Sequence, residues 1–263
     1  MQTSSPGDAD ASIARRSPDT AIWELFHSAI CTGNPDRQKL SRIAAICNLD
    51  SIKPKQIISE FERWVEHYRI MSSPGIDHIL VLVKFNIFRA LMSNARDLGI
   101  PNKSCMDDDA LSPYSDPSHN PRCIRPLPAA LQPTDLQREI CHHPWVDTIP
   151  IPGLRDNLLL AAGSYDDLKL CADLVGVHGE STDRNGMIVW GDPWDPASWE
   201  VTEAFATDWG WAIRGCDRLC QSTNYWRKRR GERPLKFERL LSQGAGTTDN
   251  SERIDGRDNL PLG

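Results

Sequence analysis

The sequence lacks an uninterrupted apolar stretch long enough to cross a membrane. A membrane-spanning helix needs about 20 predominantly apolar residues, and the best candidate, residues 76–98, is interrupted by Asp77, Lys84, Arg89 and Arg96. We therefore expect no membrane-spanning helix. The first residues have no apolar core and carry acidic side chains, which argues against a secretory or mitochondrial leader.

Motifs of several large enzyme classes are also missing. No GxSxG, GxxxxGK[ST] or GxGxxG string occurs, so a nucleophile-elbow hydrolase, a P-loop protein and a dinucleotide-binding enzyme have no anchor in the sequence. No CxxC pair and no HExxH string occurs either, which removes the usual spacings of zinc ligands. We expect neither a metal nor a cofactor.

Positive charge is not in excess. The formal net charge is -6 and the pI is near 5.6, which disfavours the chain-wide basic surface that non-specific nucleic-acid binding needs. The eight cysteines are scattered along the chain. This distribution is typical of reduced thiols packed in the core of an intracellular protein.

The composition, with 40% hydrophobic and 25% charged residues, is that of a globular protein. Helical periodicity dominates, so we predict a mainly α fold: an irregular helical domain with long Pro-rich loops and at most one short β element. Residues 1–18 and 242–263 are expected to be disordered. Residues 20–73 are expected to form an N-terminal helical segment, and residues 76–232 one helical domain with a Pro-rich connection over 101–133.

Local signals predict where individual elements begin and end. Residues 76–98 keep a helical period and are followed by Gly99, which is typical of a helix C-cap. Thr134 and Gln137 have the spacing of a capping box at a helix start. Helices are also expected at 154–162 and at 165–175, the second between a Ser164 cap and Gly176. Three more are expected after an Asp195–Pro196 cap, after a Thr202 cap, and from an Asp217 cap to Gly231, which is the last helix expected. One strand is expected at 187–190.

Seven of the nine tryptophans lie between residues 145 and 226. A group of indole rings forms either a stiff core or the wall of a ligand or partner pocket, and we favour the core, with Trp194 needed for folding. Polar residues lie among them. The candidate partner or ligand surface comprises His142, His143, Trp145, Asp147, Trp190, Asp192, Trp194, Asp195 and Trp199.

An alternative hypothesis is a hydrolase or small-ligand-binding protein with a Trp-lined, carboxylate-bearing cleft. Asp192, Asp195, Glu200 or His143 could then act as acid or base. No set of nucleophile, base and orienting group can be named from the spacing, and adjacent histidines such as His142 and His143 cannot easily coordinate one ion on a regular element. We assign no catalytic residue and favour a non-enzymatic role.

Arg155, Asp156 and Asn157 form a compact polar triplet, which we interpret as a structural hub of ion pairs and hydrogen bonds. The prolines within residues 142–158 deny this segment a long helix, so its backbone groups need side-chain partners. We expect the segment to pack against the VWGDPWDP loop in one rigid core.

Charge is segregated along the C-terminal half. Residues 156–209 carry eleven acidic side chains against two basic ones, whereas residues 214–239 carry nine basic against three acidic. Opposed charges favour a charged partner protein or self-association. The four consecutive cations predict a basic patch, serving as a solvated surface, a nuclear-import signal or a phosphate contact: Arg227, Lys228, Arg229 and Arg230.

Three strings resemble a fungal domain of uncharacterised function: FNIFRALMSNARDLGI at 85–100, the HHPW and RDNL strings within 127–159, and VWGDPWDP within 186–232. In that family the domain commonly lies C-terminal to a basic leucine-zipper region of transcription regulators. The resemblance covers about residues 76–232 and implies a fungal nuclear regulator. The family has no established catalytic residues.

A basic zipper requires one uninterrupted helix of roughly 50 to 60 residues. Prolines at positions 6, 18, 35, 54, 74 and 101 exclude such a helix here. We therefore expect an interaction or regulatory domain that lacks its own zipper and binds no specific DNA sequence. It would act through another protein, such as a transcription regulator, or by self-association, in the nucleus or cytoplasm rather than outside the cell.

Overall fold

The computed structural model describes residues 78–101, 103–116, 126–176 and 186–243. This part of the chain is mainly helical, with one two-stranded sheet, which confirms the predicted fold class. None of its helices is long and apolar enough to cross a membrane. Its elements are α4 (His78–Asp97), α5 (Asp135–Glu139), α6 (Pro152–Leu160), α7 (Asp167–Val175), β1 (Met187–Val189), β2 (Trp199–Val201), α8 (Glu203–Asp208), α9 (Asp217–Arg229) and α10 (Phe237–Gln243).

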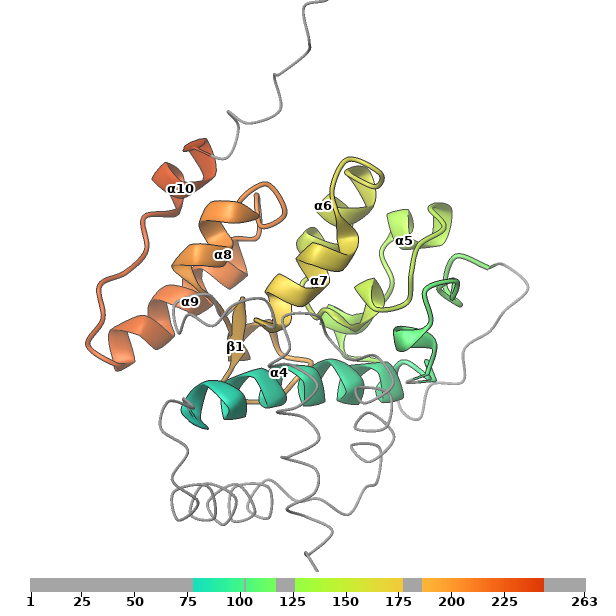
Figure 1. Ribbon diagram of the computed structural model, residues 1–263, viewed down its shortest axis with the longest axis horizontal. Helices are drawn as coiled ribbons and strands as arrows, with labels where there is room; N and C mark the ends of the chain where they lie inside the picture. The colour runs from blue at the N-terminus through green and yellow to red at the C-terminus, as the bar shows by residue number, and fades with distance from the viewer. Residues whose placement is uncertain (1–77, 102, 117–125, 177–185, 244–263) are drawn as a thin grey trace, which may run out of the picture.

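Among the described residues, helix α4 runs along one edge, and β1 and the later helices all lie on one side of it (Figure 1). Its last helical residue is Asp97, and the predicted C-terminal glycine, Gly99, follows with a φ of 71°. The Gly99 amide donates to the Arg96 carbonyl at 3.0 Å and the Ile100 amide to the Ala95 carbonyl at 2.8 Å, the two bonds of a Schellman motif. The start predicted at residue 76 lies outside the described residues.

The hairpin of β1 and β2 was only half predicted. Its antiparallel register pairs Ile188 with Glu200 and Val189 with Trp199. The second strand was missed because the Asp195–Pro196 signal predicted a helix after it. The strand alternates apolar and polar residues, Trp199, Glu200 and Val201, but three residues are too few for this pattern to indicate a strand.

Two helix starts differ from prediction. Helix α7 is capped by Asp166, whose carboxylate accepts from the Lys169 amide at 2.9 Å. Ser164, the predicted cap, instead donates its hydroxyl to the Ala161 carbonyl. The cap position of α9 is Cys216, and Asp217, the other predicted cap, is the first helical residue. An acidic residue stabilises a helix start both at the cap position, by accepting a hydrogen bond, and in the first turn, through the helix dipole. The sequence alone therefore does not distinguish a cap residue from a first-turn residue.

The other helix signals give a mixed result. The capping box of Thr134 and Gln137, the Thr202 cap of α8 and the Gly176 end of α7 are confirmed. Asp195 caps a short 3₁₀ helix, Pro196–Ser198, rather than an α-helix. Helix α6 begins at Pro152, two residues before its predicted start, because proline is accepted in the first turn.

The prediction that the helix from Asp217, α9, is the last one is wrong. Beyond it, Asn224 fixes the chain at Leu235: its Oδ1 accepts from the Leu235 amide at 2.7 Å and its Nδ2 donates to the Leu235 carbonyl at 3.2 Å. Helix α10 follows and packs on α8. The packed structure therefore continues past residue 232. The predictions for 1–18 and 20–73 lie outside the described residues, as does most of 242–263.

The core joins α4 to the hairpin and the helices beyond it. Asn94 of α4 crosses this boundary, because its Nδ2 donates to the carbonyls of Thr148 at 2.9 Å and Pro193 at 3.0 Å. Trp199 is fully buried, whereas Trp194 is half-buried and Trp190 is 41% exposed. The tryptophans are therefore divided between the core and the surface.

Candidate functional site

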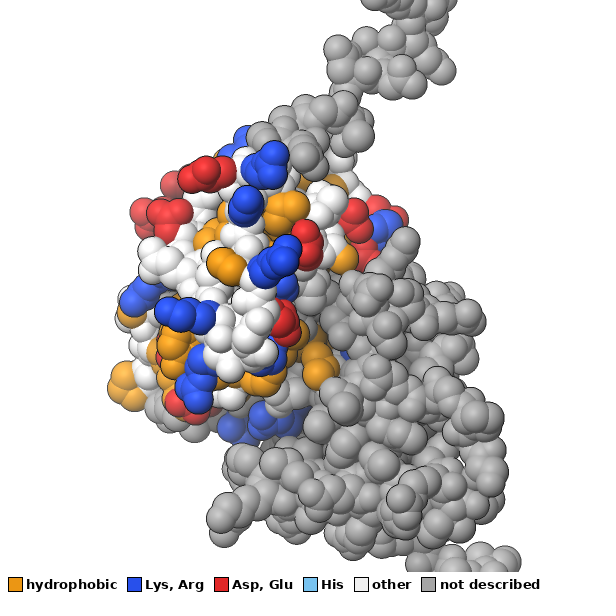
Figure 2. All heavy atoms as spheres, turned by 90° about the vertical axis from the view of Figure 1, so that its left-hand side faces the viewer, with side chains coloured by type: hydrophobic (Ala, Val, Ile, Leu, Met, Phe, Trp, Pro, Cys, Tyr) orange, Lys and Arg blue, Asp and Glu red, His pale blue; other side chains and the backbone are white. Residues whose placement is uncertain are grey.

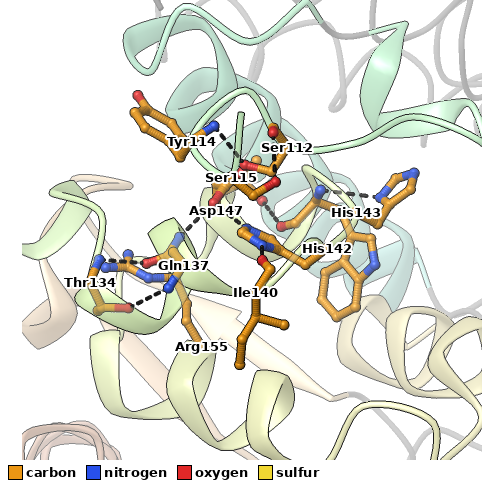
Figure 3. Close-up of polar contacts among 12 residues, drawn as sticks. Ser112, Tyr114, Ser115, Thr134, Gln137, Ile140, His142, His143, Asp147 and Arg155 are labelled. Carbon is orange, nitrogen blue, oxygen red and sulfur yellow. Dashed lines mark hydrogen bonds and ion pairs between the residues drawn. The ribbon is translucent and has the colours of Figure 1, made fainter. Parts of the chain in front are cut away.

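One group of polar side chains is buried around the start of α5. Thr134 and Gln137 bond reciprocally: the Thr134 amide donates to Gln137 Oε1 at 3.0 Å, and the Gln137 amide donates to Thr134 Oγ1 at 3.3 Å. This capping box directs the buried Gln137 side chain inward, where its Nε2 donates to Asp147 (Figure 3). Asp147 lies in a 3₁₀ helix, Val146–Thr148, and is itself buried.

Asp147 also binds His142. His142 Nε2 lies 2.9 Å from Asp147 Oδ1, and Nδ1 lies 2.6 Å from the Ile140 carbonyl oxygen. Because carbonyl and carboxylate oxygens only accept, both ring nitrogens donate and the imidazole carries a positive charge. Burial alone would lower the pKa of His142, but the hydrogen bond and charge of Asp147, helped by the Ile140 carbonyl, outweigh it and raise the pKa.

Arg155 of α6 is fully buried and binds backbone oxygens. Its guanidinium donates to the carbonyls of Ala130 at 2.8 Å, Ile149 at 2.7 Å and Gln132 at 2.8 Å. Burial lowers the pKa of Arg155 to about 10, against the opposing charge of Asp147. The residue thus holds the Pro-rich connection and the segment before α6 against one another.

The two residues that follow Arg155 point to other elements. Asp156 accepts from Thr134 Oγ1 at 2.6 Å, which joins α6 to the start of α5. Asn157 Nδ2 donates to the carbonyls of Ala212 at 2.9 Å and Arg214 at 2.8 Å. Each member of the triplet therefore makes a different tertiary link.

The side chains named in the hydrolase hypothesis are engaged separately. His143 Nε2 donates to the Asp107 carbonyl at 2.8 Å. Asp195 caps its 3₁₀ helix by accepting from the Ala197 amide at 3.0 Å, and Asp192 is exposed. Both ring nitrogens of His142 are occupied, so it has no nitrogen left to take a substrate proton. Across the described residues, no three His, Cys, Asp or Glu side chains are grouped to hold a metal ion.

A second polar site lies at the surface, where the hairpin meets α9. Trp190 and Trp226 stack with ring centroids 5.4 Å apart and planes 20° apart. Trp226 Nε1 donates to the Ala197 carbonyl and Trp190 Nε1 donates to Glu200 Oε2, each at 2.8 Å. Both indoles are thus fixed at their polar edge as well as by stacking.

Arg230 closes this site. Its Nη1 donates to Glu200 Oε2 at 2.7 Å and its Nη2 to Glu200 Oε1 at 2.6 Å. Its Nε donates to Glu232 Oε1 at 2.8 Å, and its Cζ lies 4.9 Å from the centre of the Trp190 ring. The hydrogen bonds to Glu200 and then to Glu232 raise the pKa of Arg230.

The predicted basic patch is therefore divided. Arg227 braces the following loop, with its Nε donating to the Arg233 carbonyl at 2.8 Å and its Nη1 lying 3.3 Å from Glu232 Oε2. Arg229 lies 5.5 Å from the centre of the Trp226 ring. Lys228 and Arg229 are exposed. We call the surface formed by Trp190, Tyr225, Trp226, Lys228, Arg229 and Arg230 the basic–aromatic face.

A hollow of about 530 Å³ adjoins this face. It lies between helix α10 and the loop that follows α9. Lys and Arg side chains lie among hydrophobic ones on this side of the molecule (Figure 2). The hollow could not be expected from the sequence elements predicted above, because α10 was not among them. The lining residues are Glu203, Arg227, Arg233, Pro234, Leu235, Lys236, Arg239 and Leu240.

These features define a mainly helical domain with a buried polar scaffold and a basic, aromatic surface. A family model described as a domain of unknown function (DUF3425) matches residues 114–220. The match is narrower than the resemblance noted from the sequence, and its description assigns no activity. Comparisons with curated proteins and with solved structures found no match.

Proposed function

We propose that this chain is a regulatory interaction domain that acts with a protein of the transcription machinery and does not itself read DNA sequence. The observation that carries the proposal is the basic–aromatic face, where Lys228 and Arg229 are exposed on a support fixed by Arg230 and Glu200. Charged groups on a rigid surface favour a complementary charged partner. The transcription setting comes from the resemblance to domains that follow basic zippers.

The geometry favours binding over catalysis. Asp147 Oδ1 and both ring nitrogens of His142 are occupied by hydrogen bonds within the buried group, and Asp147 Oδ2, which has no hydrogen-bond partner among the described residues, is buried away from solvent. Glu200 is neutralised by Arg230. Sequence reading would require an element that fits a DNA groove with side chains free to contact base edges. In α9 the cations are Arg218 in the first turn and three residues of the last turn, with none between them, so the helix has no continuous basic half to lie in a groove.

A tethering assay tests this function. The full chain is fused to an unrelated DNA-binding module that carries its own nuclear-import signal, and expression of a reporter carrying that module's site is measured in fungal cells. The fusion should change reporter expression, and Lys228→Glu with Arg229→Glu should remove the change. Arg138→Glu with Arg218→Glu alters charge equally at other exposed positions and should behave as the unaltered chain.

Two results would overturn the proposal. One is an unaltered fusion that leaves reporter expression at the level of the DNA-binding module alone. The other is tight binding of a specific duplex by the purified chain at physiological salt, with a Kd of about 10⁻⁹ M, which is the affinity of a sequence reader.

A further inference from the structure

We propose that the hollow between helix α10 and the loop that follows α9 binds an acidic, leucine-containing segment of the partner protein. This inference rests on the proposed function and names the chemistry of the partner.

The charge of the hollow selects an acidic ligand. Its lining has four cations and one carboxylate, Glu203. Arg227 is committed to Glu232 and to the backbone of Arg233. The side chains of Arg233 and Lys236 are exposed and make no ion pair with any residue that the structure describes. They are therefore available to carboxylates of a partner.

The floor of the hollow is aliphatic and held in place. Leu235 is 7% exposed and Leu240 is half-buried. Asn224 binds both backbone groups of Leu235, which fixes the loop on α9. A wall that is already ordered lowers the entropic cost of binding. An apolar side chain of the ligand, placed between carboxylates, would lie on this floor.

A nucleic acid fits this surface less well than an acidic peptide does. Binding of single strands relies on aromatic faces on which bases stack, and the lining of the hollow contains no aromatic residue. On the neighbouring basic–aromatic face, Trp190 and Trp226 stack on each other, with Arg230 over one ring and Arg229 over the other. A base would have to displace these guanidinium groups.

Fluorescence anisotropy with the full chain tests the site. The probe is a short labelled peptide in which Asp alternates with Leu. Arg233→Glu with Lys236→Glu should weaken its binding by about tenfold or more, which corresponds to about 1.4 kcal/mol. Arg138→Glu with Arg218→Glu, the matched change of charge, should leave the Kd within about twofold. A peptide with Asn in place of Asp should not bind.

Some outcomes would refute the site. An equal loss in the matched variant would mean that net charge, not the hollow, binds the peptide. Tighter binding of oligothymidylate than of the peptide would identify a nucleic-acid surface instead. Unchanged thermal unfolding of both variants ensures that the comparison reports binding.

The site and the proposed function can fail independently. If Arg233→Glu with Lys236→Glu abolishes peptide binding but leaves the tethered reporter unchanged, the function stands and the hollow is not its partner site. If the peptide binds the hollow while the unaltered fusion leaves the reporter at its background level, the site stands and the regulatory function falls.

Discussion

Arg230 holds the carboxylate of Glu200 in a two-pronged ion pair across 30 positions of the sequence. The Glu200 side chain is 2% exposed and that of Arg230 is 29% exposed. A cation that had been interpreted as part of a solvated run therefore supports the hairpin. Replacing the four cations 227–230 together would change both the stability of the fold and the charge of the surface. The role of each cation therefore has to be tested with separate variants.

Arg230→Ala should lower the free energy of unfolding by about 3 kcal/mol, because Glu200 would be left buried without its counter-charge. Urea unfolding of the purified chain measures this. Lys228→Ala removes a cation two residues away that makes no ion pair with a described residue, and it should change the free energy of unfolding by less than about 0.5 kcal/mol. Equal stability of the two variants would contradict a structural role for Arg230.

The His142–Asp147 pair should make stability depend on pH. Since the pKa of His142 is raised in the folded chain, the pair contributes fully below the unfolded value of about 6.5 and loses its contribution as pH rises through the folded value. The stability advantage of the unaltered chain over His142→Gln should thus shrink from mildly acidic to alkaline pH. Urea midpoints measured across this range provide the test, and an advantage that grows with pH would exclude a charged His142.

Trp199 and Trp194 should differ in their importance for folding. Trp199 is fully buried and its Nε1 donates to the Pro193 carbonyl at 2.9 Å, so Trp199→Ala should cost about 3 to 5 kcal/mol. Trp194, which was expected from the sequence to be needed for folding, is half-buried. Trp194→Ala should therefore lower the free energy of unfolding by less than Trp199→Ala does. Thermal unfolding of the two variants compares them directly, and a larger loss at Trp194 would reverse this assignment.

Nuclear accumulation should depend on Lys228 and Arg229, the two exposed members of the basic run that make no ion pair with a described residue. An import receptor binds accessible cations, and those of Arg227 and Arg230 are paired with carboxylates. Lys228→Ala with Arg229→Ala should lower the nuclear-to-cytoplasmic fluorescence ratio of a large fluorescent fusion. Arg138→Ala with Arg218→Ala serves as the control, and an unchanged ratio in the first variant would show that this run is not an import signal.

Signals with a local mechanism were predicted well from the sequence. The Gly99 end of α4, the Thr134 capping box and the Thr202 cap each depend on residues within one helical turn. Local signals fail where neighbouring residues compete for the cap position, as Asp166 does with Ser164 and Cys216 with Asp217. The sequence therefore predicted helix type and several helix ends.

Features that depend on distant contacts were not predictable in the same way. The partner of Glu200 lies on another element, and Asn94 reaches backbone groups 54 and 99 residues away. Helix α10 is different, because its signal was present: Phe237, Leu240 and Leu241 have helical spacing after Pro234. That segment was missed because it lies beyond the resemblance that set the expected boundary.

The Arg230–Glu200 pair determines how the protein could be shortened. A fragment cut at residue 220, where the family match ends, would stop inside α9 and lose Arg230 together with Trp226. Glu200 would keep its place in β2 with no cation beside it, and the outer face of Trp190 would be uncovered. Limited proteolysis should therefore leave a resistant core that reaches at least to Glu232, beyond the end of the segment that the family model matches.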